Sequence, residues 1–274
     1  MDGLLPPVVP HLELWPYDLA AARRQARAFD RRITELPDDV GLVERLRAME
    51  SVAAARDHAQ LTTKATKLRL EAVGMRESAG LEVPYELLER VGVGLSGVNQ
   101  HRKARPHLER ALASCEAGSD QAALGRVAFR LGVAYGCGAP RKLGMAALLY
   151  ERAVELLSKV HGEDHPSLLG PLGMLTDLER VRGRHDIARR CAERGLGIAR
   201  RVFGFGAGKP VPLLANGLPA GTSEVTLFVH AIARGLPMGP ERADLERRFP
   251  FGVRRSADEI AAAWGSPLPT SSAG

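Results

Sequence analysis

The strongest constraint on the fold is an internal repeat with an offset of 42 residues. Residues 146–162 align with residues 188–204 at this offset, and a shorter third copy lies at residues 104–113. In each copy two small residues stand seven positions apart: Ala104 and Ala111, Ala146 and Ala153, and Ala188 and Gly195. Seven residues are close to two helical turns, so both members of a pair share one face. Small residues on such a face let a neighbouring helix approach closely, and the repeat therefore predicts stacked helices.

Each small-residue segment follows another helix with its own apolar stripe. The stripes step by three or four residues, as one face of a helix requires. Their members are Leu88, Val91 and Leu95; Leu131 and Tyr135; and Leu172, Leu175 and Leu178. Glycine or polar residues divide the two helices of each pair, and the repeating unit is predicted to be helix–turn–helix.

Two motifs give this pattern a family resemblance. One is Leu131-Gly132-x-x-Tyr135 with Ala146, Tyr150 and Ala153 after it; the other joins residues 150–153, the linker His161-Gly-Glu-Asp-His-Pro166 and residues 183–188. With these motifs the chain resembles a tetratricopeptide repeat (TPR) protein of the longer-repeat kind found in kinesin light chains, clearly over residues 84–204. The resemblance implies an all-α fold, a right-handed superhelical solenoid of antiparallel helix pairs, with a less regular C-terminal tail.

The chain departs from the family pattern at three places. Glu179 replaces the expected aromatic residue, and Asn99 replaces the usual turn glycine. The turn after Tyr135 is also longer than its counterparts in the flanking repeats.

The resemblance and the local composition predict four regions: an N-terminal arm at 1–16, a capping helix at 17–39, TPR-like repeats at 40–204, and a linker with short helices at 205–274. A degenerate repeat is expected at residues 40–77, its second helix beginning near Asp57. The short helices are expected at 222–236, 240–248 and 256–264, packing on the last repeat as a cap. Residues 265–274 are expected to be disordered.

Composition narrows the class of protein. The chain of 274 residues is long enough to bury a sizeable core, and its 5% aromatic residues favour helices over sheets. Its three cysteines, Cys115, Cys137 and Cys191, are far apart, which argues against a disulfide framework, and inert packing is expected of them. No secretory signal and no membrane-spanning run is recognisable. The sequence therefore predicts a cytoplasmic protein without a membrane association.

The positive charge is concentrated in the repeats. Residues 83–203 hold 19 basic and 13 acidic side chains, which equals the whole net charge of +6. Eight arginines fall within residues 180–201. Such a stripe attracts acidic peptides, nucleic acid or anionic lipid, or it is the solvated face of an arginine-rich helix. Because no aromatic stacking platform accompanies it, the second interpretation is favoured and nucleic acid is disfavoured as a partner.

Catalytic and metal-binding motifs are not recognisable. His161 and His165 have metal-ligand spacing, but Gly162 interrupts the helix face that they would share. The glycine-rich stretch at 204–209 lacks the first glycine and the hydroxyl residue of a phosphate loop. We therefore expect no enzyme activity, no cofactor and no metal.

The resemblance instead points to a groove, because the first helix of each pair lines the concave face in this family. Carried over position by position, the groove residues are Arg90, Arg126, Phe129, Arg130, Asp177 and Arg180. Arginines around one aromatic anchor suit a peptide with acidic residues. The alternative is that these arginines pair with Glu86, Glu89 and Asp177 across neighbouring repeats and bind nothing.

The predicted function is a non-catalytic scaffold that binds a partner protein or peptide in this groove. The alternative is a sensory module like the repeats that bacterial signalling proteins join to a kinase or a transcription regulator. Weak nucleic-acid binding through the arginine-rich last repeat is a third reading. Because exposed end repeats often self-associate, a homo-oligomer also stays open.

Overall fold

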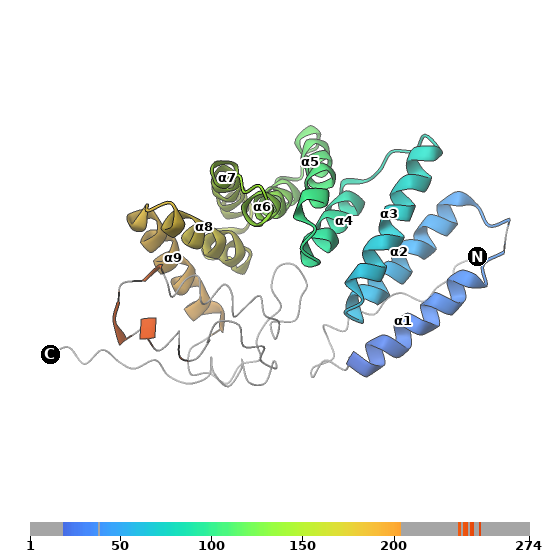
Figure 1. Cartoon of the computed structure of the whole chain (residues 1–274), viewed down its shortest axis with the longest axis horizontal. Helices are drawn as coiled ribbons and strands as arrows, with labels where there is room; N and C mark the ends of the chain where they lie inside the picture. The colour runs from blue at the N-terminus through green and yellow to red at the C-terminus, as the bar shows by residue number, and fades with distance from the viewer. Residues whose placement is uncertain are drawn as a thin grey trace. The chain divides into compact units, whose positions relative to one another are not determined.

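The computed structural model describes residues 19–37, 39–203, 235–236, 238–240, 242–243 and 247, with the side chains of 19, 166 and 199–203 left aside. This part of the chain forms helices and contains no strand (Figure 1). The helices are α1 (Leu19–Thr34), α2 (Leu42–His58), α3 (Thr62–Ser78), α4 (Tyr85–Gly97), α5 (His101–Ala117), α6 (Gln121–Cys137), α7 (Leu143–His161), the short 3-10 helix η2 (Pro166–Leu168), α8 (Leu169–Val181) and α9 (His185–Phe203). The predicted arm at 1–16, the linker from 205 and the helix at 256–264 lie outside the described residues, as do residues 265–274.

The helices fall into two compact units. The first contains α1–α5 together with the Cys137–Pro140 turn, and the second contains α6 up to Gly136 and α7–α9. In the first unit consecutive helices pack on one another from α1 to α5, and in the second α7 packs on α8 and α8 on α9. The contact of α6 with α7 is made by Phe129 and Tyr150, whose ring centroids lie 6.0 Å apart. The predicted helix pairs of residues 84–204 are therefore confirmed as α4–α5, α6–α7 and α8–α9.

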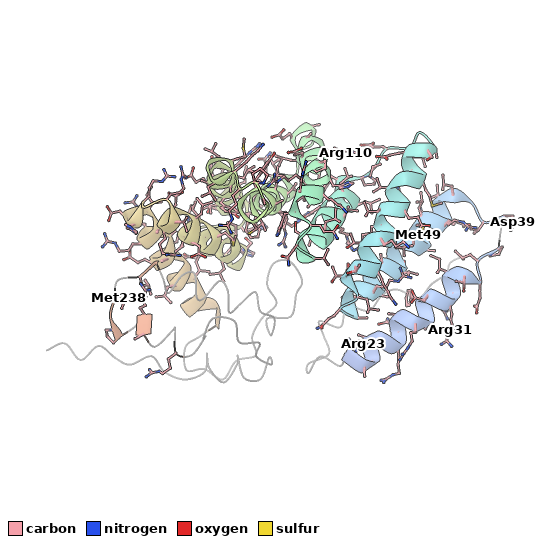
Figure 2. All side chains as sticks on the ribbon, viewed as in Figure 1. Arg23, Arg31, Asp39, Met49, Arg110 and Met238 are labelled. Atoms are coloured by element: carbon pink, nitrogen blue, oxygen red, sulfur yellow. The ribbon has the colours of Figure 1, made fainter. Side chains whose placement is uncertain are left out.

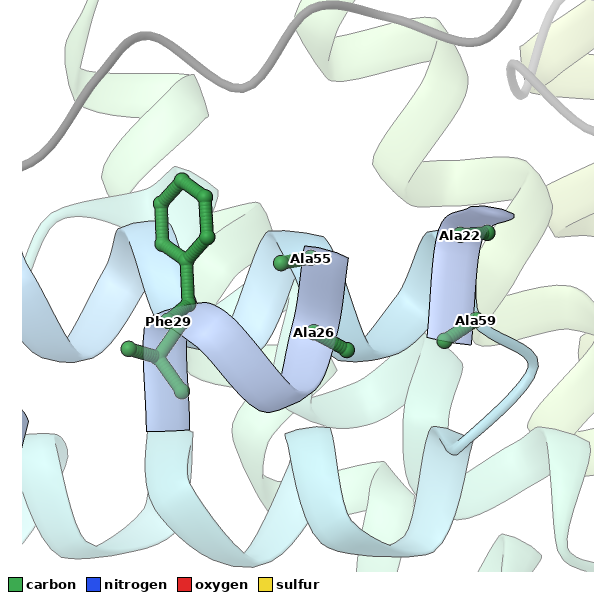
Figure 3. Close-up of a cluster of buried hydrophobic side chains, with 6 residues drawn as sticks. Ala22, Ala26, Phe29, Ala55 and Ala59 are labelled. Carbon is green, nitrogen blue, oxygen red and sulfur yellow. The ribbon is translucent and has the colours of Figure 1, made fainter. Parts of the chain in front are cut away.

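The N-terminal part of the first unit extends the repeat pattern. Ala22, Ala26 and Phe29 of α1 form a buried cluster with Val52, Ala55 and Ala59 near the end of α2 (Figure 3). Residues 40–77, where a degenerate repeat is expected, contain the helices α2 and α3. The second of these helices begins at Thr62 and not near Asp57, because a turn around Gln60 reverses the chain first.

Three helix pairs share one turn geometry. Gln60, Asn99 and Gly183 have φ of 58°, 59° and 76°, in the left-handed region. The residue after each of them donates its N–H to a carbonyl five positions back, at 2.8 Å in all three turns. This is the bond of a Schellman motif, which usually needs glycine. Asparagine tolerates the left-handed region better than most residues, which explains Asn99 at the position of the turn glycine.

The longer turn between α6 and α7 is held by hydrogen bonds from a buried arginine of α5. Arg105 of α5 is 9% exposed, and its guanidinium donates to the carbonyls of Gly138 (2.9 Å) and Pro140 (3.0 Å). The two carbonyls thus receive charge-assisted hydrogen bonds away from water. The additional residues of this turn therefore have a defined place in the fold.

Candidate partner-binding surface

The predicted groove residue of the first unit is Arg90 on α4. Its guanidinium donates to Glu50 of α2 at 2.9 Å, and its side chain is 54% exposed. The same Glu50 carboxylate accepts from Arg69 of α3. Arg90 is therefore neutralised across neighbouring helix pairs, as the structural alternative expects, but by Glu50 and not by Glu86 or Glu89.

Arg126, Phe129 and Arg130 lie on α6 in the second unit. Both arginines are half-buried and stand one helical turn apart. The Phe129 ring is only 7% exposed and packs on Tyr150 of α7 with a centroid separation of 6.0 Å. The guanidinium of Arg130 lies 5.3 Å from the centroid of the Phe129 ring, a cation–π contact. Phe129 thus belongs to the core and supports Arg130, whereas the sequence suggested an exposed apolar anchor.

Asp177 and Arg180 lie on α8. Their side chains are 35% and 36% exposed, and they form an ion pair of 3.5 Å within one helical turn. At this exposure such a pair contributes about 0–1 kcal/mol to stability. The two groups are accessible from solvent and carry opposite charges.

Glu179, which stands where the family pattern has an aromatic residue, is a buried carboxylate. Glu179 is fully buried and accepts from Arg182 and Arg184, each at 2.8 Å. Both arginines lie in the turn that follows α8. A charged residue therefore occupies the place of the expected aromatic one, and the turn next to it supplies its counter-charges.

Most of the arginine stripe is neutralised by acidic neighbours. Besides the pairs already given, Arg189 contacts Asp186 at 3.1 Å, and Arg194 contacts Glu163 at 2.5 Å and Ser158 at 2.7 Å. The paired members of the stripe are Arg180, Arg182, Arg184, Arg189 and Arg194.

The stacked histidines do not have the geometry of a chelate. The rings of His161 and His165 stack with centroids 4.5 Å apart and planes 23° from parallel, so their nitrogen lone pairs do not converge on one point. Backbone N–H of Ser167 also donates to Nδ1 of His165. Among the described residues, no group of three His, Cys, Asp or Glu side chains could hold a metal ion.

A cavity of about 420 Å³ lies within the second unit, among α7, α8 and α9. Its lining includes Leu172, Leu175 and the half-buried Cys191. Burial, and then the charge of Glu179, raise the pKa of the Cys191 thiol to about 11. At neutral pH this thiol is protonated and a poor nucleophile. Cys115 is buried as expected, while Cys137 is exposed, so the packing role expected for Cys137 is wrong.

The burial of Arg69 in the first unit was not predicted from the sequence. Arg69 of α3 is 2% exposed and is held by two carboxylates of α2, Glu50 at 3.2 Å and Asp57 at 2.5 Å. Burial lowers the pKa of this guanidinium, but Asp57 and Glu50 outweigh burial, so the pKa is raised. The seven-residue spacing of Glu50 and Asp57 was the signal, since it puts both on one face of a helix.

No family model and no curated protein matches the sequence. Solved structures do resemble the fold. BtubC (BKLC) from P. vanneervenii is 17% identical with a TM-score of 0.57, over 70% of this chain and 77% of BtubC. A putative kinesin light chain with nearly identical TPR-like repeats, from Podosopora anserina, is 18% identical with a TM-score of 0.52, over 67% of this chain and 93% of the other.

The apo form of RapI is 14% identical with a TM-score of 0.57. The match covers 84% of this chain and 57% of RapI, so this chain spans little more than half of RapI's length. Within the described part of the chain, no helix is both long and apolar enough to cross a membrane. The consecutive helix pairs and these neighbours together show that the chain has the TPR-like helical repeat fold.

Proposed function

We propose that this chain is a non-catalytic scaffold that binds another protein through the first helices of its repeats. The observation that carries the proposal is the pair Arg126 and Arg130 on α6. They stand one turn apart on a first helix, and Arg130 is braced on Phe129. Two guanidinium forks at this spacing suit carboxylates one turn apart on a partner helix, or spaced along an extended peptide.

Charge supports the same proposal. The net charge of +6 steers an acidic segment toward the chain. Asp177 and Arg180 of α8 add one charge of each sign, which favours a partner with a mixed but mainly acidic motif. Arg90 takes a smaller part, since Glu50 already holds it. The ion pairs of the arginine stripe make nucleic acid a poorer candidate than protein.

Affinity capture from source-cell lysate, read by mass spectrometry, tests the proposal. We expect wild-type protein to retain a partner that the double reversal Arg126→Glu/Arg130→Glu does not. The matched control is Arg23→Glu/Arg27→Glu on α1 (Figure 2 labels Arg23), because both residues are exposed and have the same spacing. It changes the net charge equally and should retain the partner.

Two outcomes would contradict the proposal. If both reversals lose the partner equally, the chain binds through its overall charge. If the α6 reversal lowers helicity or strongly lowers the melting temperature, these arginines are structural. The identity of the partner decides the role of the scaffold: a kinase or a transcription regulator would identify it as the sensory module of the alternative interpretation.

A further inference from the structure

The cavity of about 420 Å³ in the second unit has a mainly apolar wall. Leu172 and Leu175 of α8 line it together with Val154 of α7 and Cys191 of α9, three helices that are labelled in Figure 1. None of the predicted groove residues lines it. Small-molecule sites have volumes of about 300–1,000 Å³ and combine apolar walls with a few polar groups that orient the ligand. The cavity meets the first of these requirements, and its charged side chains decide the second.

Four of the six charged side chains that line the cavity are neutralised in pairs. Arg194 of α9 contacts the carboxylate of Glu163 at 2.5 Å and also donates to the buried hydroxyl of Ser158 at 2.7 Å. Lys159 contacts Glu155 at 2.5 Å within α7. These two pairs leave little charge for a ligand to compensate.

The other two charged side chains of the lining are Arg190 of α9 and Glu151 of α7. Both are exposed, and neither has an ion-pair or hydrogen-bond partner within the described part of the chain. Burial, and then Glu179, have the largest effects on the pKa of the Cys191 thiol; Arg190 lowers the same pKa, and Glu151 raises it. Both charges therefore lie close to the cavity wall at Cys191, one on each of two helices. We call Arg190 and Glu151 the rim charges.

We propose that the cavity binds a free α-amino acid with an apolar side chain. The guanidinium of Arg190 holds the carboxylate of the ligand, the carboxylate of Glu151 holds its ammonium group, and its side chain packs on Leu172 and Leu175. A zwitterion complements both rim charges at once, whereas an anionic ligand would leave Glu151 without a partner and a cationic ligand would leave Arg190 without one. The apolar wall supplies the hydrophobic part of the affinity. The bound ligand joins α7 to α9, the second helices of consecutive repeats.

Isothermal titration calorimetry of the full-length chain with L-leucine and with L-phenylalanine tests the proposal. We expect at least one of the two to bind wild type, and Arg190→Gln and Glu151→Gln each to weaken this binding about tenfold or more. The matched controls are Arg189→Gln and Glu193→Gln, which remove the same charges from exposed positions of α9 outside the lining. Both controls should bind like wild type. Circular dichroism verifies that all four variants keep their helicity.

Analogues of the amino acid that binds more tightly separate the contacts. Its N-acetyl form lacks the ammonium group, its amide lacks the carboxylate, and glycine lacks the apolar side chain. Each should bind about tenfold more weakly or worse. The N-acetyl amide, which represents the same residue within the chain of a partner protein, should not bind.

The cysteines report where the ligand lies. Saturating ligand should slow the alkylation of Cys191 by N-ethylmaleimide, followed by peptide mass spectrometry, and should leave that of the exposed Cys137 unchanged. The proposal is wrong if neither amino acid binds, if the N-acetyl form or the amide binds as tightly as the zwitterion, if either rim variant binds like wild type, or if the ligand does not protect Cys191.

Discussion

Arg69 in the first unit and Glu179 in the second are the most deeply buried charged side chains among the described residues, and the two are neutralised in different ways. In the first unit Arg69 of α3 draws its partners, Glu50 and Asp57, from the preceding helix α2. In the second unit Glu179 of α8 draws its partners, Arg182 and Arg184, from the turn directly after it. One compensation joins two helices, whereas the other is completed within five residues of sequence.

The two units should therefore differ in how many helices loosen when the ion pairs of the buried charge are removed. Glu50 also holds Arg90, so its carboxylate links α2 to both α3 and α4. The Glu179 cluster holds the end of α8 to its own turn, next to Gly183. Loss of the first network should loosen three helices, and loss of the second should loosen one helix end and its turn.

The largest expected loss of stability comes from removing the ion-pair partners of Glu179 or of Arg69. Arg182→Ala/Arg184→Ala leaves Glu179 buried without a counter-charge and should lower the free energy of unfolding by about 3–5 kcal/mol. Glu50→Gln/Asp57→Asn should cost a similar amount through Arg69. Urea unfolding followed by circular dichroism measures both. Hydrogen exchange should then rise in α2, α3 and α4 for the second variant, but around α8 and its turn for the first.

A surface pair provides the control for these variants. Arg189→Ala removes an ion pair with the exposed Asp186 and should change stability by about 0–1 kcal/mol. Glu179→Met, which removes the charge and keeps the volume, should cost less than the loss of both arginines. A Glu179→Met variant that is the less stable of the two would refute the comparison.

A smaller effect is expected at the close glycines of the two units. A Cβ on Gly132 would lie 2.6 Å from Cε1 of the fully buried Tyr150 ring, whereas Gly92 faces the branched end of Leu108. Gly132→Ala should cost about 1–3 kcal/mol, and Gly92→Ala at least as much, because a Cβ there would lie 2.3 Å from Cγ of the fully buried Leu108.

Gly74 on α3, where an added Cβ meets nothing within 4 Å, gives the matched control. Gly74→Ala should gain about 0.5–1 kcal/mol through helix propensity alone. Thermal melts distinguish the three variants, and equal losses at Gly132 and Gly74 would rule out the steric explanation.

The smallest effect concerns the shared turn. Gln60 in the first unit has a side chain and is therefore sterically strained in the left-handed conformation, whereas Gly183 in the second unit is not. Gln60→Gly should therefore stabilise the chain by about 1 kcal/mol, and Gly183→Ala should destabilise it by a similar amount. If both substitutions shift the melting temperature in the same direction, the two turns are not equivalent.

The sequence predicts the helix pairs well because their signal is local. Small residues at Ala104, Ala146 and Ala188 and the apolar stripes before them are set by helical periodicity alone. Periodicity alone does not show whether a residue at the edge of the packed helix face points into the core or toward the groove. For this reason Phe129 was expected in the groove, whereas it lies in the core.

Contacts between helices are the part that sequence could not provide. The pairing of Arg90 with Glu50 depends on the register of α2 against α4, and forty residues separate the two. Glu179 was recognisable as a departure from the family pattern. Its partners were not, because nothing in the spacing showed that the turn folds Arg184 back toward the helix.

The most direct test of the proposed binding surface is a titration with a labelled glutamate-rich peptide, followed by fluorescence anisotropy over a salt series. Wild type and Arg23→Glu/Arg27→Glu should bind alike, and Arg126→Glu/Arg130→Glu should bind at least about tenfold more weakly, with a smaller salt dependence. A glutamine-rich analogue should bind none of them well. Equal binding by all three proteins would contradict the central claim that the α6 arginines recognise an acidic partner.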